Sequence, residues 1–269
     1  MITIGSIAVL FYAIAWLALV THWQAKLKRA EPPKLSRHCL KFWAIAAALH
    51  AVYLYAPLFH EQHIALDFLS AASHIMWLAS IILLLSSLKQ DIESLNLFIL
   101  PFVGLALTLQ MVTAEHDNTN LILNSGVGIH IFSALLAYSM LMIAAIQSLI
   151  LAYQHKQLHA RQTNLFLQAL PPLQVMDSLL FRFIGTGLVL LSIALLTGFI
   201  YLENLFGQNV GHKTILSIVA WFVFSGLLFG RWRYGWRGLS AVRWTLSGFG
   251  LLMLAFFGTK FVQEYLLTS

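Results

Sequence analysis

Long apolar runs separated by short polar segments dominate this chain of 269 residues. The hydrocarbon core of a bilayer is about 30 Å thick, so one helical crossing needs about 20 apolar residues. Runs of this length satisfy their backbone groups in lipid only as helices, and the alternating pattern of barrel strands is absent. The pattern predicts an all-α, polytopic membrane helix bundle, a single membrane domain over 1–269, with about eight transmembrane helices at 3–22, 39–58, 66–88, 94–113, 127–152, 182–202, 214–230 and 241–260.

The longest predicted connection covers about 153–181. It contains the polar run QHKQLHARQTN and then FLQALPPLQVMDSLLF, which a Pro171-Pro172 pair interrupts. Two interpretations stay open for this segment. It forms a short amphipathic helix on the inner leaflet, or it is a solvated linker between two parts of the bundle.

Positive charge alternates from one connection to the next, which orients the chain. The connections before spans 2, 4, 6 and 8 hold 14 of the 16 Lys and Arg residues, whereas the opposite side holds only Lys213 and Lys260. The positive-inside rule therefore predicts that both termini lie on the outer face of a cytoplasmic-type membrane. The first run, MITIGSIAVLFYAIAWLALV, has no positive residue before it, so we expect a first membrane helix and not a cleaved signal peptide.

Composition narrows the classes of function. Hydrophobic residues make up 59% of the chain and charged residues 10%, which leaves little room for a soluble domain. The net charge of +6 reflects membrane orientation, so it does not indicate a nucleic-acid partner. Cys39 is the only cysteine, which excludes a disulfide framework or a CxxC thiol-exchange site. Acidic residues fall in connections or near span ends, and this disfavours an ion-coupled transporter.

Histidine carries the candidate chemistry, with eleven residues in the chain. Depth along the predicted spans places four of them in the outer half of the bundle: His50, His74, His130 and His212. Neutral imidazole is an axial ligand of haem iron, and the propionates of a haem need cationic partners such as Lys213 or Lys260. The alternative for each histidine is an interhelical hydrogen bond or a place at the membrane interface.

Three segments resemble the cytochrome c assembly (CcsA/ResC/HemX-like) family of membrane proteins, in particular its short, YpjD-type bacterial inner-membrane subgroup. They are GVGIHIFSALLAYSMLMIAAIQSLILAYQ at 126–154, PPLQVMDSLLFRFIGTGLVLLSIALLTGFIYLENLFG at 171–207 and GHKTILSIVAWFVFSGLLFGRWRYGWRG at 211–238. The likeness covers essentially the whole chain and is strongest over 126–238. One departure is that the loop 203–212, ENLFGQNVGH, has no tryptophan, whereas the haem-delivering members have a tryptophan-rich loop there.

This resemblance implies a role in haem handling, accessory to c-type cytochrome biogenesis or to haem homeostasis, and an accessory role more than an enzymatic one. It matches His130 to the family's outer histidine, and His212 with Lys213 to the end of the family's outer loop. We expect His130 to ligate haem together with His212, or with His50 or His74. The expected partners are the lipid bilayer, haem, and proteins of cytochrome c maturation or haem biosynthesis. The alternative is a structural or regulatory interaction protein that keeps the bundle and binds no haem.

Overall fold

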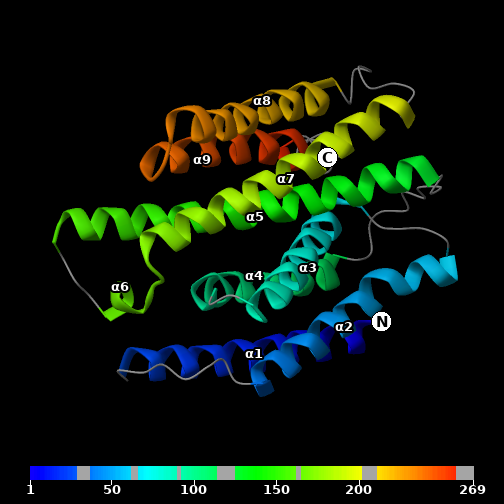
Figure 1. Ribbon diagram of the computed structural model, residues 1–269. Helices are drawn as coiled ribbons and strands as arrows, with labels where there is room; N and C mark the ends of the chain where they lie inside the picture. Colours follow the sequence, from blue (N-terminus) through cyan, green and yellow to red (C-terminus); the bar gives the residue numbers. More distant parts are fainter. Residues whose placement is uncertain are drawn as a thin grey trace. The chain divides into compact units, whose positions relative to one another are not determined.

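The computed structural model describes residues 1–28, 37–61, 66–89, 92–113, 125–161, 165–201 and 211–258. These residues are helical almost throughout and contain no strand (Figure 1). Eight of the described helices are long and apolar enough to cross a membrane. The predicted all-α bundle of about eight spanning helices is therefore confirmed.

The described helices fall into two compact units. Unit 1 covers 1–122 and 163–171, and unit 2 covers 123–162 and 172–269. Unit 1 contains α1 (Ile2–Lys28), α2 (Arg37–Glu61), α3 (Phe68–Ser87), α4 (Glu93–Thr113) and the short α6 (Leu165–Ala169). Unit 2 contains α5 (Ser125–His159), α7 (Leu173–Tyr201), α8 (Gly211–Tyr234), α9 (Leu239–Met253) and the π-helical turn η1 (Leu254–Gly258), which continues α9.

In unit 1, α1 packs against both α2 and α4, and α3 packs against α2 and α4. Small side chains at Ala8, Ala15 and Ala46 are fully buried, which brings these helices close together. Large apolar side chains such as Leu10 and Leu17 are exposed on the outward face of α1. That face suits contact with lipid chains, as expected of a membrane-spanning helix.

In unit 2, α5 and α7 run alongside each other over much of their length, and α8 packs on α9 (Figure 1). The interior is formed by Leu141, Ile143, Ile184, Phe224 and Leu252, which are almost fully buried. Outward-facing Val189, Leu196, Ile200 and Phe222 are exposed. Both the buried and the exposed faces of these helices are therefore apolar. Core residues differ from lipid-facing residues in burial and not in polarity.

The predicted connection 153–181 is largely helical. Its polar run continues α5 to His159, and Lys156 and His159 lie in the last turn, where they complement the helix dipole. Hydropathy marks where a helix leaves the membrane and not where it ends, so α5 and α7 are longer than predicted. α7 begins at Leu173, directly after the Pro171-Pro172 break, and the Pro172 carbonyl accepts from the N–H of Val175 at 2.9 Å.

α6 is the only part of this connection with its own short helix among the described residues. It packs against α1, and Leu167 and Leu170 are buried. The Phe166 ring lies 5.8 Å from the Trp23 ring and 6.3 Å from the Phe98 ring. Of the two interpretations, the structure therefore favours a helix, one that is five residues long and packs on the protein.

Candidate functional site

Two of the predicted ligands, His50 and His74, are fully buried in unit 1, whereas His130, His212 and Lys213 belong to unit 2. The proposed pairing of His130 with His212 lies within one unit. The pairings of His130 with His50 or His74 join different units and stay predictions.

His50 belongs to a chain of hydrogen bonds through the interior of unit 1. Trp43 Nε1 donates to Ser80 Oγ at 2.7 Å, and Ser80 Oγ donates to the Tyr12 hydroxyl at 3.5 Å. Tyr12 lies 3.4 Å from His50 Nδ1, and His50 Nε2 lies 3.0 Å from Ser73 Oγ. Because the tryptophan N–H can only donate, the chain is satisfied when Tyr12 donates to Nδ1 and His50 Nε2 donates to Ser73. Both imidazole nitrogens of His50 are thus engaged within the protein.

His74 follows Ser73 on α3 and forms different hydrogen bonds from His50. Its Nδ1 donates to the Ser70 carbonyl at 2.7 Å, which leaves the lone pair on Nε2. That Nε2 is buried, and it has no hydrogen-bond partner within the described part of the chain. The Tyr55 ring meets the His74 ring edge-on, with the centroids 5.6 Å apart. A buried polar atom without a partner is unusual in a protein and asks for an explanation such as a ligand.

His130 of α5 shows the same arrangement in unit 2. Its Nδ1 donates to the Ala194 carbonyl of α7 at 2.7 Å, so its Nε2 also carries the lone pair. Among the described residues, no hydrogen bond reaches that Nε2. The ring is partly buried and is held against a helix that is 64 positions away in the sequence.

His212 and Lys213 lie in the first turn of α8, where the His212 side chain is exposed and that of Lys213 is half-buried. Lys260, the other predicted outer cation, lies outside the described residues. Within the described residues no group of three or more His, Cys, Asp or Glu side chains is arranged to hold a metal ion. The predicted haem site needs only one or two imidazole ligands, so it does not require such a group of three side chains.

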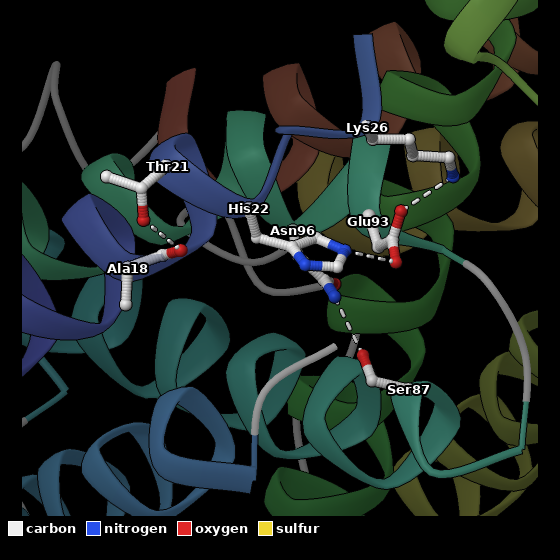
Figure 2. A network of polar contacts seen from close by, with 7 residues as sticks. All are labelled: Ala18, Thr21, His22, Lys26, Ser87, Glu93 and Asn96. Carbon is white, nitrogen blue, oxygen red and sulfur yellow. Dashed lines mark hydrogen bonds and ion pairs between the residues drawn. The ribbon is translucent and has the colours of Figure 1, made fainter. Parts of the chain in front are cut away.

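A buried charge cluster at one end of unit 1 was missed by the sequence prediction. His22 and Lys26 of α1 converge on Glu93, the first residue of α4 (Figure 2). His22 Nε2 lies 3.0 Å from Glu93 Oε1, and Lys26 Nζ lies 2.7 Å from Oε2. The Glu93 side chain is only 8% exposed, so this carboxylate depends on its two partners.

A signal for this cluster was available in the sequence. His22 and Lys26 are four positions apart, so they share one helix face and can reach one carboxylate. Glu93 lies just outside the predicted span 94–113, among the acidic residues of connections and span ends, so the sequence analysis did not single it out. In the same region Asn96 Nδ2 donates to Ser87 Oγ at 2.7 Å, which joins α4 to α3 (Figure 2).

A second unpredicted ion pair lies at the α8–α9 turn, where residues 235–238 read GWRG. Arg231 Nη1 lies 2.7 Å from Asp177 Oδ2 of α7 and 3.3 Å from the Trp236 carbonyl. Gly235 and Gly238 both have positive φ, at 68° and 57°, a conformation that glycine adopts without strain. Arg231 therefore joins α8 to α7 and to the turn, and the N–H of Gly238 donates to Asp177 Oδ1 at 3.5 Å just before α9 begins.

A model of the Cytochrome C assembly protein family matches residues 40–267 of the chain. The inner membrane protein YpjD of Escherichia coli K12 is 40% identical over 146 residues, which are 54% of this chain and 55% of that protein. The protein HemX of Brevibacillus brevis is 25% identical over 163 residues, or 60% of each chain.

The cytochrome c biogenesis protein CcsA of a Synechococcus strain is 28% identical over 100 residues, which are 36% of this chain and 29% of that protein. The region matched to YpjD thus spans about half the length of that protein. No solved structure matches the chain.

Proposed function

The chain belongs to the cytochrome C assembly protein family, as its sequence resemblance predicted, and from this premise we propose that it binds and handles haem in the membrane. It is a multi-pass protein of the bacterial inner membrane. We propose that this role is accessory to c-type cytochrome biogenesis or to haem homeostasis. The relatives named for cytochrome c biogenesis support the proposal at the level of the family.

The observation that carries the proposal is the buried Nε2 of His74, which has no hydrogen-bond partner among the residues that the structure describes. Histidines that bind metals almost always donate their other ring N–H to a carbonyl or carboxylate, which fixes the tautomer and the orientation of the ring. His74 does so through Ser70 and His130 does so through Ala194, each at 2.7 Å. Both residues therefore present the nitrogen that an iron atom would need.

The residues fit a haem in two respects. Neutral imidazole is a common axial ligand of haem iron, and a bound haem would supply a redox-active iron. His74 also has an aromatic neighbour, Tyr55, which is in edge contact with Trp77. We assign His74 and His130 as the first candidate ligands and Lys213 as a candidate partner of a propionate. His50 and His212 stay as candidates, although His50 would have to release a hydrogen bond first.

The test is the absorption spectrum of the protein purified in mild detergent after expression with haem supply. We expect a Soret band for the parent chain, and a loss of at least half of it in His74→Gly or His130→Gly. Free imidazole should restore part of the band in these two variants, because it can occupy the space of the deleted ring. The control is His159→Gly, since His159 also donates from Nδ1 to a carbonyl, that of His155, but is exposed at the end of α5.

A size-exclusion profile separates loss of the ligand from loss of the fold. A parent chain that shows no Soret band and retains no haem on titration would overturn the proposal. So would a band of unchanged height in the His74, His130, His50 and His212 variants alike. The absence of haem in the parent chain would favour the alternative, a membrane interaction protein without haem, whereas an unchanged band in all four variants would reject these histidines as the ligands. That alternative also requires His130→Ala with His212→Ala to leave cellular function intact.

A further inference from the structure

Unit 2 contains a cleft that plays no part in the proposed haem role. Its volume is about 480 Å³, and it lies where α5, α7, α8 and the turn before α9 meet. Basic residues concentrate at this end of the unit, so the positive-inside rule places the cleft at the inner face of the membrane. Its lining residues are Leu151, His155, Leu173, Gln174, Asp177, Arg231, Arg237, Gly238 and Leu239.

The two arginines of the cleft differ in what they contact. Arg231 is paired with Asp177 at 2.7 Å and also stacks over the Phe181 ring, so it forms a fixed wall. The Arg237 side chain is exposed, and no ion pair or hydrogen bond joins it to another described residue. With Arg231 and Asp177 neutralising each other, Arg237 leaves the lining with one net positive charge when His155 is neutral.

Backbone donors add to this charge. The N–H of Gly238, the N-cap of α9, donates to Asp177 Oδ1 at 3.5 Å, whereas the N–H groups of the first turn from Leu239 onward have no side-chain cap. Helix N-termini attract anions through these groups and through the helix dipole. The His155 ring lies beside Gly238. A Cβ atom added at Gly238 would lie 3.7 Å from His155 Cδ2.

The surroundings of the cleft are those of the membrane interface. Trp232 and Tyr234, at the end of α8, are 81% and 67% exposed. Exposed tryptophan and tyrosine at the end of a spanning helix lie at the level of the lipid headgroups. Three leucines line the cleft beside the charged groups, so an amphipathic ligand would be matched at both of its ends.

We propose that this cleft binds a phosphate-bearing anion. Arg237 and the first turn of α9 would donate to the phosphate, while the Arg231–Asp177 pair holds the walls in place. Basic pockets between helices on the cytoplasmic side of membrane proteins bind acidic headgroups. The phosphate belongs to an acidic phospholipid of the inner leaflet or to a soluble compound, and the experiment distinguishes these sources.

Native mass spectrometry of the detergent-purified full chain, together with its thermal stability, provides the test. We expect phosphatidylglycerol to bind at least tenfold more tightly than phosphatidylcholine with the same acyl chains. Arg237→Gln should weaken that binding about tenfold, since it removes a charge-assisted contact. The matched control is Arg243→Gln, because Arg243 is equally exposed on α9 but does not line the cleft. That variant should bind as the parent does.

Inorganic pyrophosphate is titrated in a parallel arm without lipid. If it stabilises the parent chain but not the Arg237 variant, the ligand is a soluble phosphate compound. If only the lipid shows this dependence on Arg237, the ligand is a headgroup. Equal losses in the Arg237 and Arg243 variants would mean diffuse surface charge and would overturn the proposal, as would no loss in either variant. None of these outcomes depends on haem binding.

Discussion

The two units differ in how most of their buried polar side chains are held. In unit 1 many buried polar groups bind other side chains, as in the chain from Trp43 through Ser80 and Tyr12 to His50. In unit 2 the buried polar groups bind mostly to backbone carbonyls. Tyr138 donates to the Leu252 carbonyl at 2.8 Å, and Gln147 donates to that of Met176 at 3.1 Å.

This difference predicts how each unit responds to substitution. A side chain that binds a carbonyl depends on a partner that no substitution removes. A side chain that binds another side chain loses its partner with a single substitution, and the orphaned group must then be accommodated in a medium without water. We therefore expect unit 1 to be sensitive to the loss of polar partners and unit 2 to be sensitive mainly to steric changes.

The largest effect is expected for Glu93→Ala in unit 1. The substitution leaves His22 and Lys26 without their shared carboxylate, so we expect a loss of about 3–5 kcal/mol in the free energy of unfolding. Glu93→Gln, which keeps a hydrogen-bonding group in place, should lose distinctly less. Unfolding of the purified protein in mixed detergent micelles measures both values. Equal and small losses in the two variants would show that the cluster is not buried as described.

A smaller effect is expected for Gly230→Ala in unit 2. A Cβ atom at this position would clash with the Trp236 ring, so the turn must shift. Overpacking of this kind costs about 1–3 kcal/mol, and the fluorescence of the displaced tryptophan should change as well. Gly250→Ala is the control, because a Cβ there meets nothing within 4 Å. If both variants were equally stable, close packing of the turn would be refuted.

The smallest effect is expected when a tryptophan–serine hydrogen bond is removed, and each unit contains one such bond. Trp43 Nε1 donates to Ser80 and Trp221 Nε1 donates to Ser192, both at 2.7 Å. Interhelical hydrogen bonds in membranes contribute about 0.6 kcal/mol on average and up to about 1.7. Ser80→Ala should lose about 1 kcal/mol, since Trp43 is fully buried and Tyr12 is also affected. Ser192→Ala should lose less, and the reverse order in the same unfolding assay would break the comparison between the units.

Hydropathy predicted much of the fold. The depth of the histidines along the predicted spans suggested part of the candidate site. Eight spanning helices were predicted and are present, because lipid leaves an apolar run of this length few alternatives to a helix. The extension of α5 to His159 was not predicted, since a helix can continue in water once its apolar run has ended. Depth along the spans placed His74 and His130 among four candidate histidines, but it could not show which imidazole nitrogen is free.

Sequence by itself determined that this chain is a membrane protein, where its helices cross and which connections carry the positive charge. These properties depend on local composition, because the residues of each segment by themselves decide whether that segment crosses a bilayer. Only the tertiary structure decided that Glu93 joins His22, that Ala194 orients His130 and that Asp177 reaches Arg231. Those partners lie 71, 64 and 54 positions apart, and helix packing alone brings them within hydrogen-bonding distance.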